Sequence, residues 1–381
     1  MHTTPLPKRA YIDQEWFDRE LELIFGNTWQ FAGFEEDLKD TGDYLTVQCG
    51  HQNILVLKDE TQSLRAFHNL CRHRGAQLLP NCGKKQYTIT CPYHHWAYKL
   101  NGELAGIPKQ QQEFPQIEKK KLGLHPAAVA NWRGMIWVHP SADAPCISTW
   151  FNDCENQLGP HQPQRLIEYP DSYYERTVQA NWKILVENFI DVYHLSQLHH
   201  QTLYMYDHDQ AVFDFVGDHF VFWEPIAQAY KEHLDKLIPF KRIQEMDDQQ
   251  LGSYVSWLFP TIGLIETESS WSTFHLTPLS PTQTKVVIRT KLEPVNTWEY
   301  LRMSTRSTAA WNKLMKKEAT RLVADSAHPL NSGDIMEEDI YVCEQQQKAL
   351  KNPLYAVGAS AQKGEYGIRG FQQRIQKWMS A

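Results

Sequence analysis

Two groups of residues that could bind metal ions lie about 100 residues apart in this chain. The first group combines two cysteines with two histidines, in the patterns Cys71-x-His73 and Cys91-x2-His94. The second group follows the pattern Glu187-x3-Asp191-x2-His194-x4-His199. Thiolates with imidazoles suit zinc or an iron–sulfur cluster, whereas histidines beside carboxylates suit a mononuclear iron with open coordination positions. One site could therefore store an electron while the other activates oxygen.

The first group lies in two short loops, and its spacing alone leaves the metal open. If the two cysteines bound one iron and the two histidines another, the group would be a Rieske cluster, whose imidazole ligands raise the reduction potential. A structural zinc site uses the same types of ligand. A chance arrangement of core residues is a third interpretation, because short motifs also arise by coincidence.

The second group places His194 and His199 five residues apart. In an ideal helix, at about 100° per residue, the two side chains would point about 140° apart. We therefore expect the helix predicted over residues 182–199 to end, widen or bend between the two histidines, as is frequent at functional sites. A carboxylate should complete the set as the third ligand.

The elements that must position the first group are short strands. Between residue 43 and about residue 139, apolar segments alternate with polar turns, which predicts a small all-β module. The predicted strands include residues 44–47, 54–57, 64–67 and 135–138. Before them, apolar positions at helical spacing over residues 11–30 predict an amphipathic helix that ends near Gly26.

The second group belongs to a region of mixed strands and helices. A stretch rich in proline and polar residues, from 140 to about 170, indicates a domain boundary. Beyond it, residues 270–276 and 285–289 predict paired antiparallel strands. Residues 302–327 and 334–350 predict helices.

The two cluster loops closely resemble those of the Rieske domain in Rieske non-haem iron oxygenases, the ring-hydroxylating dioxygenase family. The segments that carry this resemblance are Cys71-Arg72-His73-Arg74-Gly75 and Cys91-Pro92-Tyr93-His94-x-Trp96-x-Tyr98. Residues 181–199 also resemble the start of the catalytic domain in this family. The resemblance is strong over residues 43–140 and 181–199 and weaker over 330–381. One departure is His95, where the family commonly has glycine, so His95 is a candidate substitute for His94, although the family spacing favours His94.

The resemblance implies roles for individual residues. The residues that would bind a Rieske [2Fe-2S] cluster are Cys71, His73, Cys91 and His94. His194 and His199 would bind a mononuclear Fe(II). Asp191 would be the carboxylate through which an electron passes from the cluster of a neighbouring subunit. The third iron ligand matches Asp339, with Glu338 beside it as the alternative.

The resemblance also implies an α+β fold. A small all-β Rieske domain over residues 41–160 would be joined to an α+β catalytic domain over residues 161–381. The catalytic domain would have a central antiparallel sheet covered by helices. Residues 1–40 would form an N-terminal helical segment that packs on the catalytic domain.

As a member of this family, the chain would be the catalytic (alpha) subunit, the terminal oxygenase of a multicomponent system. It would use O2 to hydroxylate or oxidatively demethylate a small organic substrate, either an aromatic compound or a quaternary amine. Electrons would come from NAD(P)H through a separate reductase, and in some systems a ferredoxin, because this chain has no Gly-rich dinucleotide fingerprint. The family further implies a head-to-tail homotrimer. A Rieske-type electron carrier and a zinc-stabilised binding module are the alternatives.

Composition argues against several other functions. The net charge of −7 does not favour a nucleic-acid partner. No segment approaches the roughly 18 consecutive apolar residues of a membrane span. The N-terminus has no apolar signal stretch and the seven cysteines are scattered, which indicates a cytoplasmic protein without a disulfide framework.

Aromatic residues crowd the segment after the two iron histidines. They could stack on an aromatic ring, surround a quaternary ammonium group by cation–π attraction, or form the core face of a sheet. These residues are Tyr204, Tyr206, Phe213, Phe215, Phe220, Phe222 and Trp223.

Overall fold

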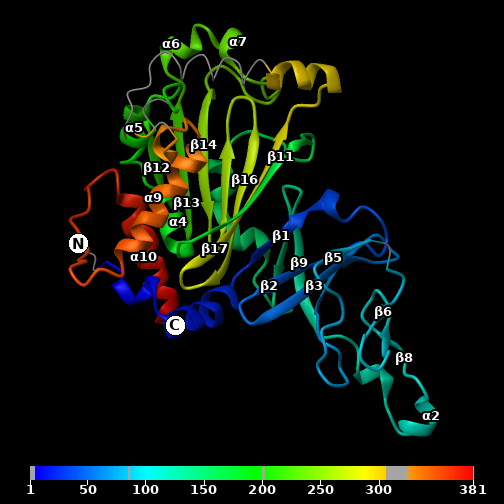
Figure 1. Cartoon of the computed structure of the whole chain (residues 1–381). Coiled ribbons are helices and arrows are strands. Elements are labelled where there is room, and N and C mark those ends of the chain that lie inside the picture. Colours follow the sequence, from blue (N-terminus) through cyan, green and yellow to red (C-terminus); the bar gives the residue numbers. More distant parts are fainter. Residues whose placement is uncertain are drawn as a thin grey trace. The chain divides into compact units, whose positions relative to one another are not determined.

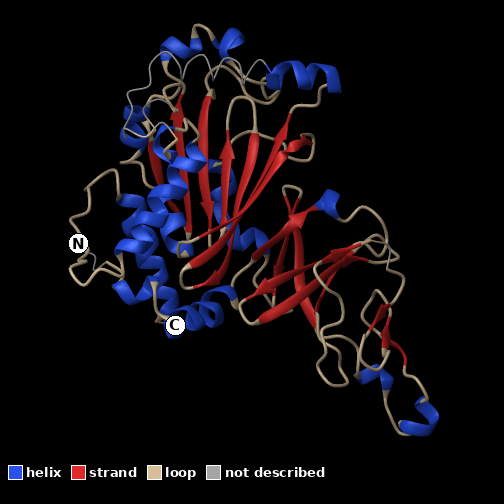
Figure 2. Ribbon diagram, in the orientation of Figure 1, coloured by secondary structure: helices blue, strands red, loops and turns tan. Residues whose placement is uncertain are grey.

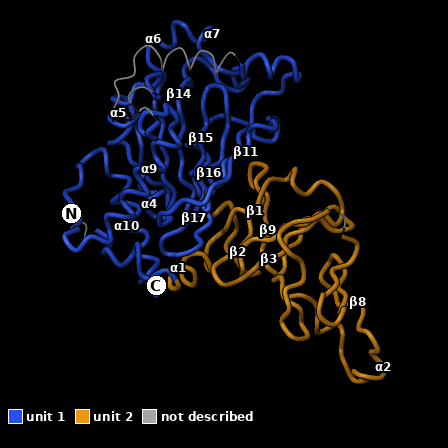
Figure 3. Tube along the Cα trace, viewed as in Figure 1, with its two compact units in different colours: residues 1–17, 151–380 blue, residues 18–150, 381 orange. Residues whose placement is uncertain are grey.

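The computed structural model describes residues 5–84, 86–199, 202–305, 323, 325 and 327–380. The chain divides into two compact units, one of residues 18–150 and one of residues 1–17 together with 151–380 (Figure 3). From the sequence we expect boundaries after residues 40 and 160, so both divisions lie earlier than expected. The first differs because β1 (Gln30–Phe34) pairs with β10 (Met135–His139) and so belongs to the sheet of the smaller unit. The expected N-terminal segment is therefore shared between the two units.

The smaller unit has the predicted all-β architecture (Figure 2). Its main sheet is antiparallel, with strand order β1-β10-β9-β4-β3-β2-β5. The other strands of this sheet are β2 (Tyr44–Cys49), β3 (Gln52–Lys58), β4 (Leu64–His68), β5 (Cys82–Gly83) and β9 (Pro126–Trp132). A second antiparallel sheet consists of β6 (Ile89–Thr90), β7 (Ala97–Tyr98) and β8 (Leu104–Gly106). The four strand segments predicted here lie within β2, β3, β4 and β10, which confirms those predictions.

The helical residues at the start of the chain end where their sequence predicts. The α-helix α1 (Gln14–Glu20) continues as one π-helical turn (Leu21–Phe25), and Gly26 follows it. Later in the smaller unit, α2 (Gln110–Glu113) is a single turn.

A hydrophobic core fills the smaller unit beside the second, three-stranded sheet. Cys71, Cys91, Trp96 and Tyr98 are part of this core, and each of them is at most 3% exposed. The two loops that carry the cysteines are therefore anchored by apolar packing rather than free at the surface.

The larger unit has an α+β architecture around one antiparallel sheet, with strand order β11-β17-β16-β15-β14-β13-β12 (Figure 1). Its strands are β11 (Ile167–Val178), β12 (Val212–Val216), β13 (His219–Pro225), β14 (Gly252–Leu258), β15 (Ile262–Glu266), β16 (Trp271–Ser280) and β17 (Gln283–Leu292). The predicted strand pair over 270–276 and 285–289 is confirmed as β16 and β17, joined through the pairing of Ser280 with Gln283.

Three helices gather beside this sheet, namely α4 (Trp182–Phe189), α9 (Ile335–Ala349) and α10 (Tyr366–Met379) (Figure 1). α4 contacts α9, α10 and β16. The shorter helices of this unit are α5 (Leu195–Leu198), α6 (Gln228–Lys231) and α7 (Leu234–Leu237). α3 (Ile147–Phe151) ends the smaller unit, and only its last residue belongs to the larger one. These elements give the larger unit the sheet-and-helix composition expected for it.

Two sequence predictions on helices have different outcomes. The helix predicted over 334–350 is confirmed as α9, whose first turn is capped by the Asp334 side chain accepting the N–H groups of Met336 and Glu337. The helix predicted over 302–327 falls largely outside the described residues. Within the described ranges, no helix has the length and apolar character needed to cross a membrane.

Candidate metal centres

The two loops of the first ligand group have the same hydrogen-bond pattern. In one loop, the Gly75 amide donates to the Cys71 carbonyl at 3.0 Å, and the Cys71 amide donates to Ala76 at 2.9 Å. In the other, the His95 amide donates to the Cys91 carbonyl at 3.1 Å, and the Cys91 amide donates to Trp96 at 2.8 Å. Both loops are therefore tight turns held by two backbone hydrogen bonds at the cysteine. The residues within the two turns have matching backbone arrangements.

The two histidines of these loops lie together. Their ring centroids are 4.6 Å apart, and the His73 ring stacks on Trp96 with centroids 4.7 Å apart. The Nδ1 atoms of His73 and His94 are buried, and neither has a hydrogen-bond partner in the described chain. Because buried polar atoms are normally hydrogen-bonded, two unpartnered nitrogens side by side are what a metal-binding pair requires.

The two cysteines also fit a positively charged group. Cys71 and Cys91 are 3% and 1% exposed. Burial and the nearby Cys91 sulfur raise the pKa of the Cys71 thiol. A thiolate at this place therefore needs a cation beside it. The Tyr98 hydroxyl lies 3.4 Å from the Cys71 sulfur, from where it can donate to a thiolate.

His95 does not join this group. Its side chain is exposed, and its backbone φ of +56° is in the left-handed region that glycine adopts most readily. Gly75, its counterpart in the other loop, has a φ of +76°. The backbone at His95 is therefore one that glycine would adopt at a lower steric cost.

The second ligand group starts on α4, and the helix is shorter than predicted. The Asn181 side chain caps its N-terminus by accepting the Lys183 amide, and the helix ends at Phe189. His194 and His199 then flank the single turn of α5, with ring centroids 5.0 Å apart. The chain therefore breaks before His194, so that the two histidines lie at the two ends of a short helix.

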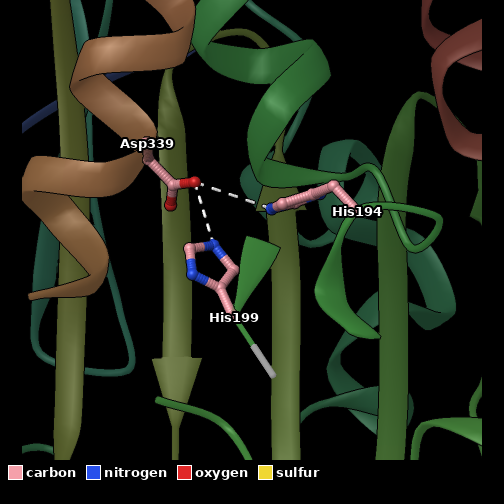
Figure 4. Close-up of side chains that lie close together, drawn as sticks. All are labelled: His194, His199 and Asp339. Carbon is pink, nitrogen blue, oxygen red and sulfur yellow. Dashed lines mark hydrogen bonds and ion pairs between the residues drawn. The ribbon is translucent and has the colours of Figure 1, made fainter. Parts of the chain in front are cut away.

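The carboxylate that meets both histidines comes from α9, far along the chain (Figure 4). Asp339 Oδ1 lies 3.0 Å from His199 Nε2 and 3.6 Å from His194 Nε2. One ligand atom from each of these three residues lies within 4.8 Å of the other two. The Asn188 side-chain amide donates to Asp339 Oδ1 at 3.2 Å. Three ligands on one side of a point, as here, are the arrangement of a two-histidine, one-carboxylate metal site.

The other nitrogen of each histidine faces a second carboxylate, but only that of His199 is hydrogen-bonded to it. His199 Nδ1–H donates to Glu338 Oε2 at 2.8 Å, and His194 Nδ1 lies 3.5 Å from Asp191 Oδ2. Because Nδ1 of each ring faces a carboxylate, Nε2 of each ring is directed toward Asp339 Oδ1. Glu338 thus orients the His199 ring, as carboxylates commonly do behind metal-binding histidines, and Asp191 lies on the corresponding side of the His194 ring.

The charges of this group are strongly coupled. Burial disfavours protonation of His194, but the contacts with Asp191 and Asp339 outweigh it and raise its pKa to about 9. The pKa of His199 is also raised, by Asp339 and Glu338 against the effect of burial. The two histidines in turn overcome burial to lower the pKa of Asp339 to about 2. The pocket therefore holds positive charge in the form of protons that a divalent cation can displace.

Glu187, part of the predicted pattern, is turned to another side of α4. Tyr11 Oη donates to its Oε1 at 2.6 Å, and the Gln372 side-chain amide donates to the same atom at 2.9 Å. Burial raises the pKa of Glu187 to about 7. It lines a separate cavity of about 920 Å³ and is not part of the metal group.

A smaller cavity of about 150 Å³ adjoins His194, His199 and Asp339. Of the seven aromatic residues singled out in the sequence, Phe220 and Phe222 line it. Sequence reasoning missed Glu224, Ser253, Val255 and Ile265, which also line it. Alternation along β13 was the available signal, because Phe220, Phe222 and Glu224 share one face of the strand.

Two family models match the chain and together span most of it. The Rieske [2Fe-2S] domain matches residues 28–129. The ring hydroxylating alpha subunit (catalytic domain) matches residues 129–381.

Individual relatives agree with these matches. Choline monooxygenase from Atriplex hortensis is 26% identical over 371 residues, which are 96% of this chain and 76% of the relative. The biphenyl 2,3-dioxygenase alpha subunit of Rhodococcus jostii is 32% identical over 202 residues, 52% of this chain and 44% of the relative. The solved structure of the quaternary ammonium Rieske monooxygenase CntA with L-carnitine superposes with a TM-score of 0.73 at 20% identity, over 98% of this chain and 95% of that one. At this identity the superposition shows the shared fold.

Proposed function

This chain belongs to the Rieske non-haem iron oxygenases, and on that premise we propose that it is the terminal oxygenase component of a multicomponent enzyme. The family carries a Rieske [2Fe-2S] cluster in its first domain and a mononuclear iron in its second. One observation supports the proposal above all: His194, His199 and Asp339 come together beside a mostly apolar cavity.

We assign the cluster to the two loops of the smaller unit. Cys71 and Cys91 would bind one iron, and His73 and His94 the other, through the Nδ1 atoms that lack hydrogen-bond partners in the described chain. The Tyr98 hydroxyl would donate to the Cys71 sulfur and stabilise the reduced cluster.

We assign the mononuclear iron to His194, His199 and Asp339. Bound there, the iron would supply the activation of O2. The protein's own residues do the positioning, since Glu338 orients the His199 ring, Asn188 holds the Asp339 carboxylate, and Asp191 faces the His194 ring. The apolar cavity walls would exclude bulk water from the substrate and leave one C–H bond facing the metal position.

The reaction we propose consumes two electrons. For a substrate R–H, the balance is R–H + O2 + 2 e⁻ + 2 H⁺ → R–OH + H2O. When R–H is an N-methyl group, the hydroxymethyl product breaks its C–N bond and releases formaldehyde. The electrons would come from NAD(P)H through a separate reductase, in some systems with a ferredoxin, because the sequence has no dinucleotide fingerprint of its own.

We also propose a homotrimer, with the cluster of one subunit serving the iron of its neighbour. One solved structure of a quaternary ammonium Rieske monooxygenase is described in terms of inter-subunit electron transfer. In this chain Asp191, which lies beside His194, would be the carboxylate through which the electron passes from the neighbour's cluster. We propose a cytoplasmic location for this assembly, and substrates drawn from the two classes named for its relatives, quaternary amines and aromatic compounds.

Metal analysis of anaerobically purified protein tests the proposal. We expect about three irons and about two acid-labile sulfides per chain, with O2 consumption and substrate hydroxylation that depend on reductase and NAD(P)H. Two irons and two sulfides, unchanged after Fe(II) is added back, would identify an electron carrier. Zinc without sulfide would identify a zinc-stabilised module. Either of these results would overturn the oxygenase assignment.

A further inference from the structure

The cavity beside the metal group contains one charged residue that the oxygenase chemistry does not use. Along β13, alternate residues face the cavity, and they run Phe220, Phe222, Glu224. Across the sheet, Phe222 pairs with Val255 and Glu224 pairs with Ser253, both of which also line the cavity. A carboxylate thus occupies the position at which the strand would otherwise continue an apolar wall.

Glu224 is a buried carboxylate of the cavity wall, and no Lys or Arg pairs with it in the described ranges. It is 2% exposed, and its Oε2 accepts from His208 Nδ1 at 2.7 Å. No other residue in the described ranges forms an ion pair with it. By contrast, Asp191 and Asp339, the other carboxylates of the cavity wall, contact the metal-site histidines. Burial of a carboxylate is costly unless a cation lies near it, so the cavity favours a positively charged occupant.

The size of the cavity points to a small occupant. A cavity of about 150 Å³ is comparable to one that takes up a single benzene ring. A trimethylammonium group is of similar size, whereas a two-ring aromatic compound needs considerably more room. The walls contributed by Phe220 and Phe222 offer aromatic rings to the same occupant.

Quaternary and tertiary ammonium groups match all of these properties. Their positive charge is spread over methyl groups that pack against apolar walls, and aromatic rings attract them by cation–π interaction. We infer that this cavity binds a methylated ammonium head group, with Glu224 as its counter-charge and Phe222 as its aromatic contact. The inference rests on the proposed oxygenase function and assigns its substrate to the amines rather than to the neutral aromatic compounds.

A charged ligand and its uncharged isostere test this assignment directly. Choline and 3,3-dimethylbutan-1-ol have the same shape, but a carbon replaces the nitrogen in the second. We would measure the Kd of both by calorimetry under argon, with the full metal complement and without turnover. For the wild-type enzyme we expect choline to bind at least about tenfold more tightly than the alcohol.

Two variants of Glu224 and one control variant test whether Glu224 causes this difference in affinity. Glu224→Gln keeps an acceptor for His208 but removes the charge, and should weaken choline at least about tenfold while leaving the alcohol unchanged. Glu224→Asp keeps the charge and should retain the preference. Glu268→Gln is the matched control, because Glu268 is also buried but is held by Tyr206 and Tyr230 away from the cavity wall. This control should bind both ligands as the wild type does.

The outcomes separate this inference from the proposed function. Equal affinity for the two ligands, absence of choline binding, or an unchanged preference in a folded Glu224→Gln enzyme would overturn the role of Glu224. Each of these results can occur with iron and sulfide fully present, which leaves the oxygenase assignment intact. Missing iron or sulfide would instead overturn the oxygenase assignment.

Discussion

Gly75 and His95 occupy equivalent positions in the two ligand loops, since each donates its amide to the carbonyl of the cysteine four residues earlier. Both have a left-handed backbone, yet only Gly75 adopts it without steric cost. His95→Gly should therefore stabilise the smaller unit by about 0.5–1 kcal/mol, because the exposed imidazole contributes little packing. The loss of cluster absorbance on heating should shift upward by a few degrees.

Gly75→Ala is the matched opposite change. A Cβ at Gly75 would meet Leu70 Cδ1 at 3.6 Å, an ordinary contact, so the backbone alone accounts for the cost. We expect a destabilisation of about 1–2 kcal/mol. If His95→Gly lowered the melting temperature, the backbone explanation of this position would be wrong.

Asp339 and Glu338 should differ sharply when each loses its charge. Asp339→Asn should abolish retention of the mononuclear iron, because it removes the carboxylate that faces both histidines. Glu338→Gln should weaken iron binding by roughly 10–100-fold, the usual effect of changing a group that orients a metal ligand. Iron counted per chain after dialysis measures both effects, and acid-labile sulfide should stay constant. The reverse order of effects would make Glu338 the ligand.

The affinity of this site for Fe(II) should keep rising with pH until an unusually high pH is reached. His194, with its pKa raised to about 9, carries a proton at neutral pH that Fe(II) must displace. Affinity should therefore rise about tenfold per pH unit between pH 6 and 8, and level off only near pH 9. Anaerobic Fe(II) titration of iron-depleted protein gives these affinities. Asp191→Asn should move the plateau to lower pH, and an affinity independent of pH over this range would contradict the charge coupling.

Glu187 should make stability depend on pH in a defined window. Its pKa is about 7 in the folded protein and about 4.5 when unfolded, so the folded chain holds an extra proton between these values. The stabilisation is complete below about pH 4.5 and is lost as the pH rises through about 7. Relative to Glu187→Gln, the wild type should therefore lose up to about 3 kcal/mol of unfolding free energy between pH 5 and 8. Urea unfolding at several pH values measures this difference, and parallel curves for the two proteins would refute it.

The residues that we assign to the cluster form local patterns in the sequence, and this has a physical reason. Cys71 and His73, like Cys91 and His94, belong to single tight loops whose geometry is set by hydrogen bonds over four residues. The short strands around them are mostly apolar runs bounded by polar turns, a pattern that is visible within a few residues of sequence. The closing helix α9 was predictable for the same reason, since its cap and apolar spacing are local.

The carboxylates that meet His194 and His199 could be identified only with long-range information. Asp339 and Glu338 are adjacent in sequence, so only the packing of α9 against α4 determines which of them faces His194 and His199. Glu187 matched the motif but points toward Tyr11 and Gln372 on the other side of α4.

Alternation along β13 marks Phe220, Phe222 and Glu224 as one face of the strand, but the sequence does not say what that face meets. Its place on the cavity is decided by the tertiary structure, because the neighbours of a strand determine which of its faces is buried. Spacing along the chain thus identifies which residue types can bind a metal. The contacts among α4, α9 and the sheet decide which of them meet, and what else shares their cavity, since those contacts join residues more than 100 positions apart.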